Sequence, residues 1–401
     1  MPAPHDAQPG PLAGVRVVDL SRVISGPYVG RLLADLGADV IKLEPPDGDQ
    51  SRQIAPRHDR GMSANFTFAN VGKRGLAVDL RQREGIELVI DLVRAAQLVI
   101  ENFRPKVIDL LGLGWEVLHA ANPSAVLLSL NGFGHDSELA NQRAYAPIMH
   151  AITGILEEQA AYADRPAIQN SDAHADTVTS LHATVALLAA LRVAEASGVG
   201  QHVEVPMFDA VLTTNSQVGR QLLPQPDDRV MNPIYDAGAH GRIATAGPVQ
   251  HIWRLLAARH DDLQDPTPPG AELATKARLR HTALEAWMAS RKDQASLLEL
   301  LADAGIACAP LTSMHEALTG AIAQERQLLS LVDDRRGGTR PVVRAAARFS
   351  NASNQVRGPA PLLGEHNASV LSEWLGYDAA RLRALEANGV LSSDPLGSPN
   401  D

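Results

Sequence analysis

Hydrophobic and polar positions along the first 205 residues follow the pattern of buried strands that alternate with helices. Residues 14–20 (GVRVVDL) are mostly apolar and rich in β-branched side chains, which predicts a buried parallel strand. Residues 28–36 have helical spacing and stop at Gly37, a residue that suits a helix C-terminus. Residues 39–43 (DVIKL) predict the next strand, so this segment forms one right-handed βαβ unit.

The same pattern repeats further along the chain. Strands are predicted at 76–80, 98–101, 125–130 and 202–205, and helices at 84–95, 107–111 and 115–121. The most apolar stretch, 177–196, contains His182, Arg192 and Glu195, so we interpret it as a core helix rather than a membrane span. The alternation indicates an α/β fold with a mostly parallel sheet, whose ligands bind at the carboxyl ends of the strands.

Beyond residue 205 the pattern changes. Helical spacing at 209–223 is followed by a connection, and residues 230–315 are interpreted as a second, smaller domain. Helices are expected there at 253–260, 282–291 and 295–304, whereas residues 236–247 have no clear periodicity. The remaining chain has short strand-like pieces from residue 342 and a last helix at 368–375.

Composition narrows the class of protein. The chain has 401 residues, 45% of them hydrophobic, which is enough for two domains with a sizeable core. Its formal net charge of −10 argues against nucleic acid or an anionic membrane as a partner. One cysteine, Cys308, excludes an intramolecular disulfide and is interpreted as a small core residue. The N-terminus has no visible secretory signal, so we expect a cytoplasmic enzyme.

The motifs of common cofactor classes are missing from the sequence. The first strand is followed by SRVISGPYVG instead of G-x-G-x-x-G, which disfavours NAD. The sequence also contains neither a phosphate-binding G-x-x-x-x-G-K-[ST] loop nor the G-x-S-x-G of an α/β-hydrolase.

Seven blocks in order instead carry a family resemblance. They are 11–52 (PLAGVRVVDLSRVISGPYVGRLLADLGADVIKLEPPDGDQSR), 72–80 (GKRGLAVDL), 101–105 (ENFRP), 131–134 (NGFG), 176–209 (a helix led by Asp176, then SGVGQHVEVPMFD), 305–310 (GIACAP) and 363–366 (LGEH). Together they resemble the family III CoA-transferases, the CaiB/BaiF type that includes formyl-CoA transferase and carnitine CoA-transferase.

The resemblance implies a Rossmann-like large domain with a mostly parallel sheet, built from both chain ends, and a smaller middle α+β domain. The expected division is residues 1–205 for the large domain, 206–229 for a linker, 230–315 for the small domain, and 316–401 for the return linker and the rest of the large domain. It also implies an interlocked homodimer that moves CoA from an acyl-CoA to a carboxylic acid, with CoA as substrate and no metal.

Asp176 stands at the position of the family's nucleophile. The resemblance implies that its carboxylate attacks the thioester, forming an aspartyl anhydride and then an aspartyl-CoA thioester. The residues alone leave two alternatives open. In the first, Asp176 is only the N-cap of an apolar helix. In the second, a strand at 172–176 would place Asp172, His174 and Asp176 on one face as metal ligands.

The resemblance also implies the segments that contact CoA. They are Ile24, Ser25, Val78, Asp79, Leu80, Arg81, Asn102, Phe103, Arg104, Arg143, Ala144 and Tyr145. Arg104 and Arg143 are candidates for phosphate contacts, with solvated surface arginines as the alternative. Lys73 and Arg74 are either part of the same surface or a pair of loop charges.

The chain departs from the family pattern in places. The glycines that usually follow the nucleophile at the third and fourth positions are Thr179 and Ser180, which would crowd the thioester or select another acyl group. The related α-methylacyl-CoA racemases need His and Asp where this chain has Tyr145 and Ala146, so proton exchange at Cα is the weaker alternative. The other alternative is a CoA-binding protein without catalytic activity.

Overall fold

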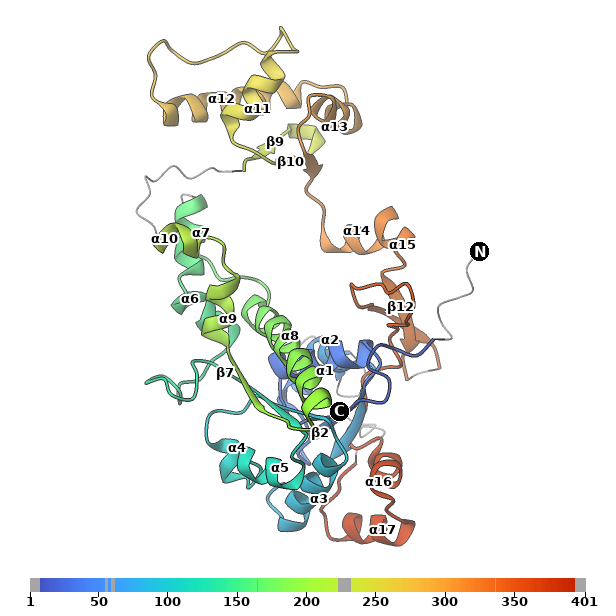
Figure 1. Ribbon diagram of the computed structural model, residues 1–401. Helices are drawn as coiled ribbons and strands as arrows, with labels where there is room; N and C mark the ends of the chain where they lie inside the picture. The colour runs from blue at the N-terminus through green and yellow to red at the C-terminus, as the bar shows by residue number, and fades with distance from the viewer. Residues whose placement is uncertain are drawn as a thin grey trace. The chain divides into compact units, whose positions relative to one another are not determined.

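A computed structural model describes residues 8–54, 57–58, 62–163, 165–222, 232–335 and 337–393. The chain divides into two compact units (Figure 1). The first unit contains Met1–Ala161, Arg165–Leu222 and Gln327–Asp401, and the second contains Tyr162–Asp164 and Leu223–Arg326. The expected boundary between the linker and the small domain, at 229–230, lies outside the described residues.

The first unit is built on a six-stranded parallel sheet in the order β5-β2-β1-β6-β7-β8. The strands are β1 (Arg16–Asp19), β2 (Asp39–Glu44), β5 (Arg74–Ala77), β6 (Leu98–Glu101), β7 (Val126–Asn131) and β8 (His202–Pro206). In the register, Val17 of β1 lies between Val40 of β2 and Leu98 of β6. Counted among themselves, the strands have the order 3-2-1-4-5-6 of a Rossmann fold, as the α/β pattern predicted.

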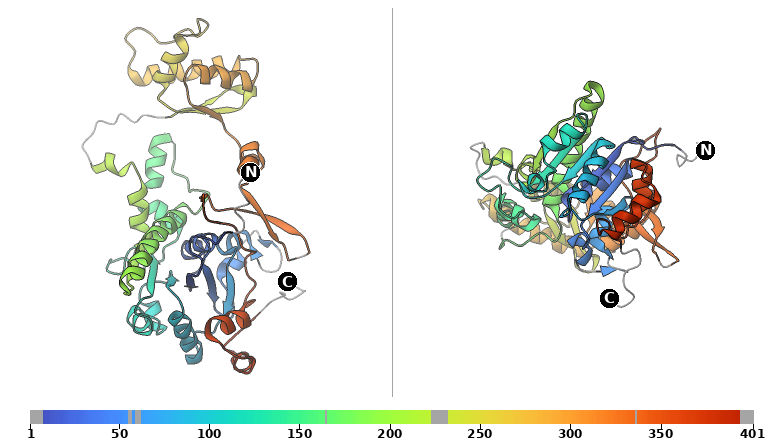
Figure 2. Two further views of the ribbon diagram at one scale, coloured as in Figure 1. Left: turned by 45° about the vertical axis from the view of Figure 1, so that its right-hand side comes forward. Right: turned by 90° about the horizontal axis from the view of Figure 1, so that it is seen from below.

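Helices cover both faces of this sheet (Figure 2). Val17, Leu98 and Leu128 point to one face, where they pack against α1 (Ser25–Asp35) and α8 (His174–Ser197). The residues that follow these along their strands point to the other face, because successive side chains of a strand alternate between the two faces of the sheet. They pack there against α3 (Arg83–Arg94), α5 (Trp115–Ala121), α16 (Asn367–Leu375) and α17 (Ala379–Ala387).

The C-terminal part of the chain, Gln327–Asp401, belongs to the first unit, but it adds no strand to the six-stranded sheet. All six strands come from residues 16–206, and the large domain expected from both chain ends corresponds to a first unit that combines these strands with Gln327–Asp401. The C-terminal part covers one face of the sheet with α16 and α17, and it forms one isolated bridge, from Leu391 to Val78. Trp374 of α16 is buried and donates from its indole nitrogen to Asp39 at 2.9 Å.

The first unit contains further short elements. They are η2 (Gln50–Gln53), β3 (Arg57–His58), β4 (Met62–Ser63), α2 (Ala64–Asn70), α4 (Val107–Leu110), α6 (Ala146–Ile152), most of α7 (Ile155–Ala163), α9 (Met207–Thr214), α10 (Val218–Leu222), β12 (Leu329–Asp333) and β13 (Thr339–Val343). The single helix expected at 209–223 is therefore two helices, α9 and α10. Strands β12 and β13 pair as an antiparallel hairpin.

The second unit has its own apolar core, formed by residues such as Tyr235, Ile252, Trp287 and Leu301. An antiparallel sheet in the order β11-β10-β9 packs with helices around this core. Its elements are β9 (Ile234–Asp236), η3 (Gly238–His240), β10 (Arg242–Thr245), α11 (Val249–Ala257), α12 (Leu273–Ala289), α13 (Gln294–Asp303), β11 (Cys308–Pro310), α14 (Met314–Thr319) and α15 (Ala321–Glu325).

Helix α8 is the one described helix whose length and composition would suffice to span a membrane. Half of its most apolar window is buried within the protein, where Ala183, Leu187 and Leu191 pack against the sheet. The apolar residues of α8 therefore pack in the core of the first unit. This agrees with the expectation drawn from the polar residues His182, Arg192 and Glu195 within this stretch.

Candidate active site at the carboxyl ends of the strands

The strand order determines where a ligand can bind in the first unit. The order reverses between β1 and β6, which leaves a crevice beyond the carboxyl ends of these two strands. Loops that follow β1, β6 and β7 meet there and line a cavity of about 390 Å³. The cavity is lined by Arg22, Val23, Ser25, Gln50, Asn102, Phe103, Arg104, Pro105, Leu130, Asn131, Gly132, Ala140, Gln142, Arg143, Ala144, Tyr145, Asp176 and Met207.

Buried charges hold the loop between β1 and α1 in place. Asp19 ends β1 on the face that carries α1, and it pairs with Lys73 at 2.7 Å with both side chains fully buried. The Lys73 ammonium also donates to Asn70 at 2.8 Å and to the Pro27 carbonyl at 2.7 Å. Lys73 is thus a buried and paired charge rather than a solvated one, and it ties the first turn of α1 to the end of β1.

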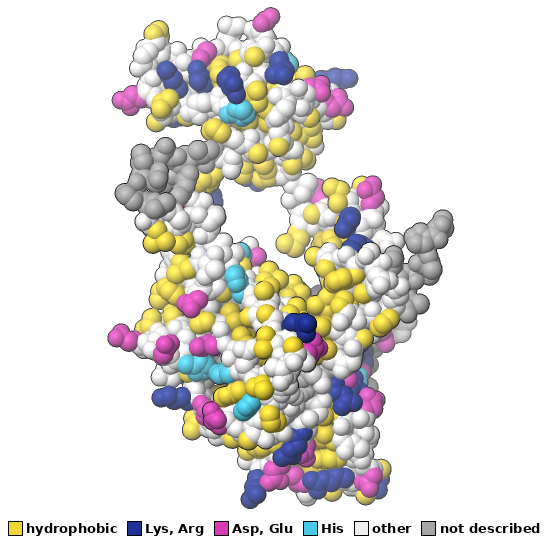
Figure 3. All heavy atoms as spheres, in the orientation of Figure 1, with side chains coloured by type: hydrophobic (Ala, Val, Ile, Leu, Met, Phe, Trp, Pro, Cys, Tyr) yellow, Lys and Arg dark blue, Asp and Glu magenta, His cyan; other side chains and the backbone are white. Residues whose placement is uncertain are grey.

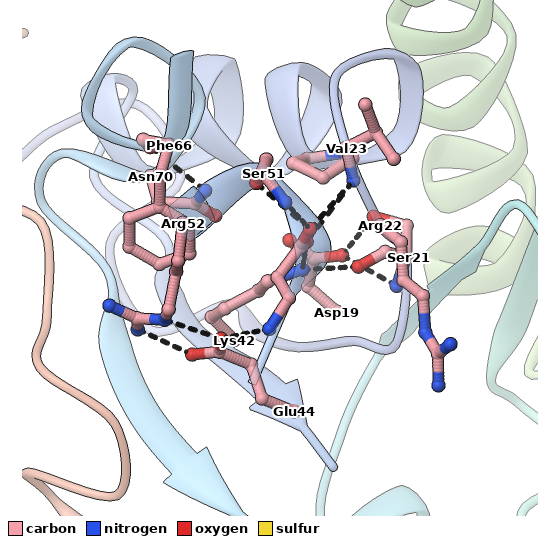
Figure 4. A network of polar contacts seen from close by, with 12 residues as sticks. Asp19, Ser21, Arg22, Val23, Lys42, Glu44, Ser51, Arg52, Phe66 and Asn70 are labelled. Carbon is pink, nitrogen blue, oxygen red and sulfur yellow. Dashed lines mark hydrogen bonds and ion pairs between the residues drawn. The ribbon is translucent and has the colours of Figure 1, made fainter. Parts of the chain in front are cut away.

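A second buried pair supports the same loop from β2 (Figure 4). Lys42 pairs with Asp49 at 3.0 Å and also donates to the carbonyl of Ser21. Asp49 accepts the backbone N–H of Val23 on both carboxylate oxygens, at 3.1 and 3.3 Å. Val23 has φ 69°, a strained value for a β-branched residue that these bonds stabilise. The loop therefore presents Arg22 and Ser25 to the cavity in a fixed conformation.

Glu101 supports the loop after β6 in a similar way. It is buried at the end of β6 and accepts the backbone N–H of Phe103 at 2.7 Å. Burial raises the pKa of the Glu101 carboxyl to about 7, against the opposing effect of hydrogen bonds from Ser129 and Phe103. Ser129 also shares a hydrogen bond of 2.8 Å with His202 of β8, so polar groups link the three adjacent strands β6, β7 and β8.

Asp176 lies in the first turn of α8, and its side chain lines the cavity. The N-cap of α8 is Ala173, so the alternative that Asp176 is itself the N-cap is wrong. The strand expected in the metal-site alternative is also wrong, because α8 already begins at His174 and the period of two does not apply there. Among the described residues no group of His, Cys, Asp and Glu is arranged to hold a metal ion.

The start of α8 is fixed by a buried histidine. His150 of α6 is fully buried, and its Nε2 accepts the backbone N–H of Ala175 at 3.1 Å. This bond satisfies one of the free N–H groups of the first turn, directly before Asp176. Burial lowers the pKa of His150, which favours the neutral ring that can accept this bond.

Three helix N-termini meet at the Asp176 carboxyl. Ser25 is the first residue of α1 and Ala146 is the first residue of α6, so their N–H groups have no partner within their own helices. Both N–H groups and the Ser25 hydroxyl hydrogen bond to Asp176, which lowers its pKa. Burial is the larger effect and raises the pKa of Asp176 to about 6. The site therefore holds a desolvated carboxylate surrounded by N–H donors.

Asn102 orients Ser25 toward Asp176. Its side-chain amide donates to the Ser25 hydroxyl at 3.2 Å and to the Arg22 carbonyl at 2.7 Å. Its side-chain carbonyl accepts the Arg22 N–H at 2.6 Å. Because the Ser25 oxygen accepts from Asn102, its own proton is free for Asp176. Asn102, expected at a CoA-binding segment, thus also connects the loop after β6 to the Asp176 carboxyl.

Three arginines surround the cavity with exposed side chains. Arg22 and Arg104 follow β1 and β6, and Arg143 precedes α6. Within the described part of the chain, none of the three forms an ion pair with a carboxylate. Arg22 lies over the Phe103 ring, with 5.4 Å between the guanidinium carbon and the ring centroid. Unpaired guanidinium groups beside a cavity are suited to bind phosphate groups.

The structure brings together most of the residues expected at the site. Asp176, Ser25, Asn102, Phe103, Arg104, Arg143, Ala144 and Tyr145 all line the cavity. Ile24 is adjacent as the N-cap of α1 but is not among the lining residues. The segment Val78, Asp79, Leu80 and Arg81 lies apart from the cavity, after β5 at the edge of the sheet.

In this last segment the side chains have other partners. Val78 is in the core, and Asp79 accepts the Arg81 guanidinium at 2.8 Å. Arg74, the other basic residue of this region, pairs with Asp39 and Glu373 at 2.6 Å each and so secures α16 to the sheet. These contacts give Arg74 a structural role.

Sequence reasoning missed several residues of the cavity, among them Arg22, Gln50, Asn131 and Gly132. Arg22 and Gly132 could have been found, because each follows a predicted strand on either side of the cavity. At Gly132 a side chain would collide with the Cβ of Ala144, so only glycine allows this close approach. Gln50 belongs to a short 3₁₀ helix that no clear pattern of residues predicts.

The fold and the site define a Rossmann-like α/β protein with a ligand cavity at its switch point. The family model for CoA-transferase family III matches residues 12–367, and this chain belongs to that family. The resemblance found in the seven sequence blocks is thereby confirmed.

Relatives of known activity match almost the whole chain. The formyl-CoA:oxalate CoA-transferase of Streptomyces avermitilis is 31% identical over 95% of this chain and 99% of its own. The succinate–glutarate CoA-transferase of Agrobacterium fabrum is 31% identical over 90% and 95%. Among solved structures, a CaiB/BaiF family protein from Brucella suis is 30% identical, with a TM-score of 0.77 over 92% of this chain and 100% of its own.

Proposed function

We propose that this protein transfers CoA from an acyl-CoA to a carboxylic acid, with Asp176 as the nucleophile. The Asp176 carboxylate attacks the thioester carbonyl and the C–S bond breaks. CoA thiolate is the leaving group, and the product is an acyl-aspartyl anhydride. The thiolate then attacks the aspartyl carbonyl and releases the donor acid, which leaves an aspartyl-CoA thioester. The acceptor carboxylate attacks this thioester, and returning thiolate releases the new acyl-CoA and restores Asp176.

The observation that carries this proposal is the setting of the Asp176 carboxyl. Its raised pKa reflects a carboxylate with little solvation and no paired cation, which makes it more basic than a surface aspartate. Conversion to a neutral anhydride or thioester removes the cost of burying that charge. The N–H groups of Ser25 and Ala146, which bond to the Asp176 carboxyl, would stabilise the oxyanion that forms on this carboxyl when the thiolate attacks the aspartyl carbonyl.

The cavity supports the proposed position of CoA. Arg22, Arg104 and Arg143 offer unpaired guanidinium groups for phosphates, while the thioester end reaches Asp176 at the same cavity. Phe103 and Tyr145 add aromatic surface beside the arginines. One expected segment lies apart from this cavity, namely Val78, Asp79, Leu80 and Arg81. We propose that the nucleotide end of CoA contacts this segment only when CoA extends along the edge of the sheet.

Substitution of Asp176 tests the assignment of the nucleophile. Transfer between succinyl-CoA and a panel of dicarboxylic acids, including glutarate and oxalate, is measured for wild type, Asp176→Asn and Asp176→Ala. We expect both variants to lose at least about 10³-fold in kcat, because no other group can form the anhydride. Asp172→Asn is the matched control, since Asp172 is exposed and does not line the cavity. Near-normal turnover by both Asp176 variants would contradict the proposal.

We also propose that two copies form a homodimer through the outer face of α8. Leu181 and Val185, one helical turn apart, are 53% and 70% exposed, and Phe68 of α2 is 44% exposed. Apolar side chains gather over α8 in the space-filling view (Figure 3). Leu181 and Phe68 line an apolar cavity of about 780 Å³ within the first unit. Apolar exposure of this extent indicates a surface covered by another chain, and interlocking of the two copies remains part of the proposal.

A further inference from the structure

Ser180 replaces a glycine of the family pattern, and the structure gives it a definite environment. Neither Ser180 nor its neighbour Thr179 lines the cavity, so these two side chains do not crowd the thioester. Both are fully buried in α8. The Thr179 hydroxyl donates at 2.6 Å to Ala175 of its own helix. The Ser180 hydroxyl, in contrast, reaches across to α1.

The Ser180 hydroxyl lies between two carbonyl oxygens. One belongs to Ser25 at 2.6 Å, and the other belongs to Asp176 at 2.7 Å, one turn earlier in α8. Bonds to the preceding turn are common for serine in helices, whereas the bond to Ser25 joins residues 155 positions apart. This cross-helix bond connects the backbone of the nucleophile's helix to the residue that donates to the nucleophile.

We propose that Ser180 is a positioning residue that fixes Ser25 against the carboxyl of Asp176. Ser25 is held from two sides, since Asn102 donates to its hydroxyl and Ser180 donates to its carbonyl. Its N–H and hydroxyl are then directed at Asp176 without reorganisation, which is the condition for electrostatic stabilisation of a developing oxyanion. A glycine at position 180 would lack this bond. The inference rests on the proposed role of Asp176.

The proposal predicts a change in the ionisation of Asp176 when only the hydroxyl is removed. In Ser180→Ala the Ser25 donors are held less firmly, the carboxylate loses part of its stabilisation, and its pKa rises by roughly half a unit to one unit. The rate of acyl transfer at neutral pH falls about 3–10-fold, while KM for the acyl-CoA stays within about twofold. Ser180→Cys keeps the size and a weaker donor, so we expect an intermediate shift.

The experiment measures this ionisation directly by NMR of protein labelled with ¹³C at the aspartate carboxyl carbons. Asp176→Asn assigns the signal, and wild type, Ser180→Ala, Ser180→Cys and Thr179→Val are titrated. Thr179→Val is the matched control, because it removes a neighbouring buried hydroxyl that bonds only within α8. We expect the Asp176 titration to move upward in Ser180→Ala and to stay unchanged in Thr179→Val.

Two results would overturn the proposal. One is an unchanged titration in both Ser180 variants, and the other is an equal shift in Thr179→Val, which would indicate a general loosening of α8. If Ser180→Ala does not fold, the titration of Ser180→Cys against Thr179→Val decides the question in the same way. A shifted titration in a protein that transfers no CoA would leave the positioning by Ser180 intact and refute the proposed function instead.

Discussion

The chemistry of the site depends on how a single carboxyl is solvated. Asp176 is largely withdrawn from water and surrounded by N–H donors from α1 and α6, and no cation of the described residues is paired with it. Burial disfavours the charged form and the donors favour it, and burial is the stronger effect. The carboxylate is thus ionised at neutral pH yet remains reactive.

The raised pKa predicts the pH dependence of the reaction. Because the nucleophile is the ionised form, the rate of acyl transfer under single-turnover conditions should fall about tenfold per pH unit below pH 6. A folded-state pKa above the ordinary value of 3.8 also means that folding takes up a proton between these two values, so this group lowers stability as the pH rises from about 4 to about 6. Asp176→Asn should lack this slope in denaturant titrations at each pH. A rate that is flat between pH 5 and pH 7 would contradict the assignment.

Single residues differ in how far the sequence could reveal them. Asp176 and Arg143 could be located by resemblance, and Arg22 follows a predicted strand at the switch point. The donors to Asp176 could not be derived, because Ser25 and Ala146 come from loops far apart in the sequence. The same is true of the bond from Ser180 to Ser25, which exists only once α1 and α8 are packed together.

At the scale of elements, buried ion pairs hold the first loop of the site. Asp19 and Lys73 are both fully buried, and they join the end of β1 to the start of β5 and the first turn of α1. Removal of one partner leaves an uncompensated buried charge, which costs far more than the pair contributes.

We therefore expect Lys73→Met to lower the free energy of unfolding by roughly 3–5 kcal/mol. The double variant Asp19→Asn with Lys73→Met should recover a large part of this loss, because the unpaired charge is gone. Arg83→Met is a suitable control, since Arg83 forms an exposed pair with Glu87, and such pairs contribute about 0–1 kcal/mol. Urea denaturation of the four proteins measures these differences, and equal losses for Lys73→Met and Arg83→Met would refute the account.

Strands such as β1, β6 and β7 could be predicted because they are mostly apolar, buried runs. Strands β9 and β10 of the second unit were missed, since they are short and few of their side chains, such as Tyr235 and Ile243, are buried apolar groups. Helix α12 begins nine residues before the expected 282, because its first half is largely polar and has no apolar stripe. Weak amphipathic patterns of this kind do not define an element without its packing partners.

At the scale of the whole molecule, composition describes the surface better than the interior. The net charge of −10 argued against nucleic acid, but it gave no sign that Lys42 and Lys73 are fully buried with aspartate partners. It also gave no sign of the arginines beside the cavity, which lie together only in the folded chain. Charge totals average over such local arrangements.

The proposed dimer predicts the mass of the protein in solution. Light scattering coupled to gel filtration should give about twice the chain mass of 42.7 kDa. Leu181→Asp combined with Val185→Asp should shift the protein toward monomer, because charges enter an apolar interface. Val199→Asp serves as the control, since Val199 is 56% exposed in the loop after α8. A monomeric wild type, or a double variant that stays fully dimeric, would refute the proposed surface.

The most direct test of the account is the mass of the peptide that contains Asp176 after the protein is mixed with succinyl-CoA and digested at low pH. We predict that this peptide gains the mass of CoA less one water, as expected for an aspartyl-CoA thioester, and that hydroxylamine releases CoA and leaves an aspartyl hydroxamate in its place. Asp176→Asn should show no such peptide. Turnover of succinyl-CoA without a covalent adduct at Asp176, or with an adduct at another residue, would contradict the account.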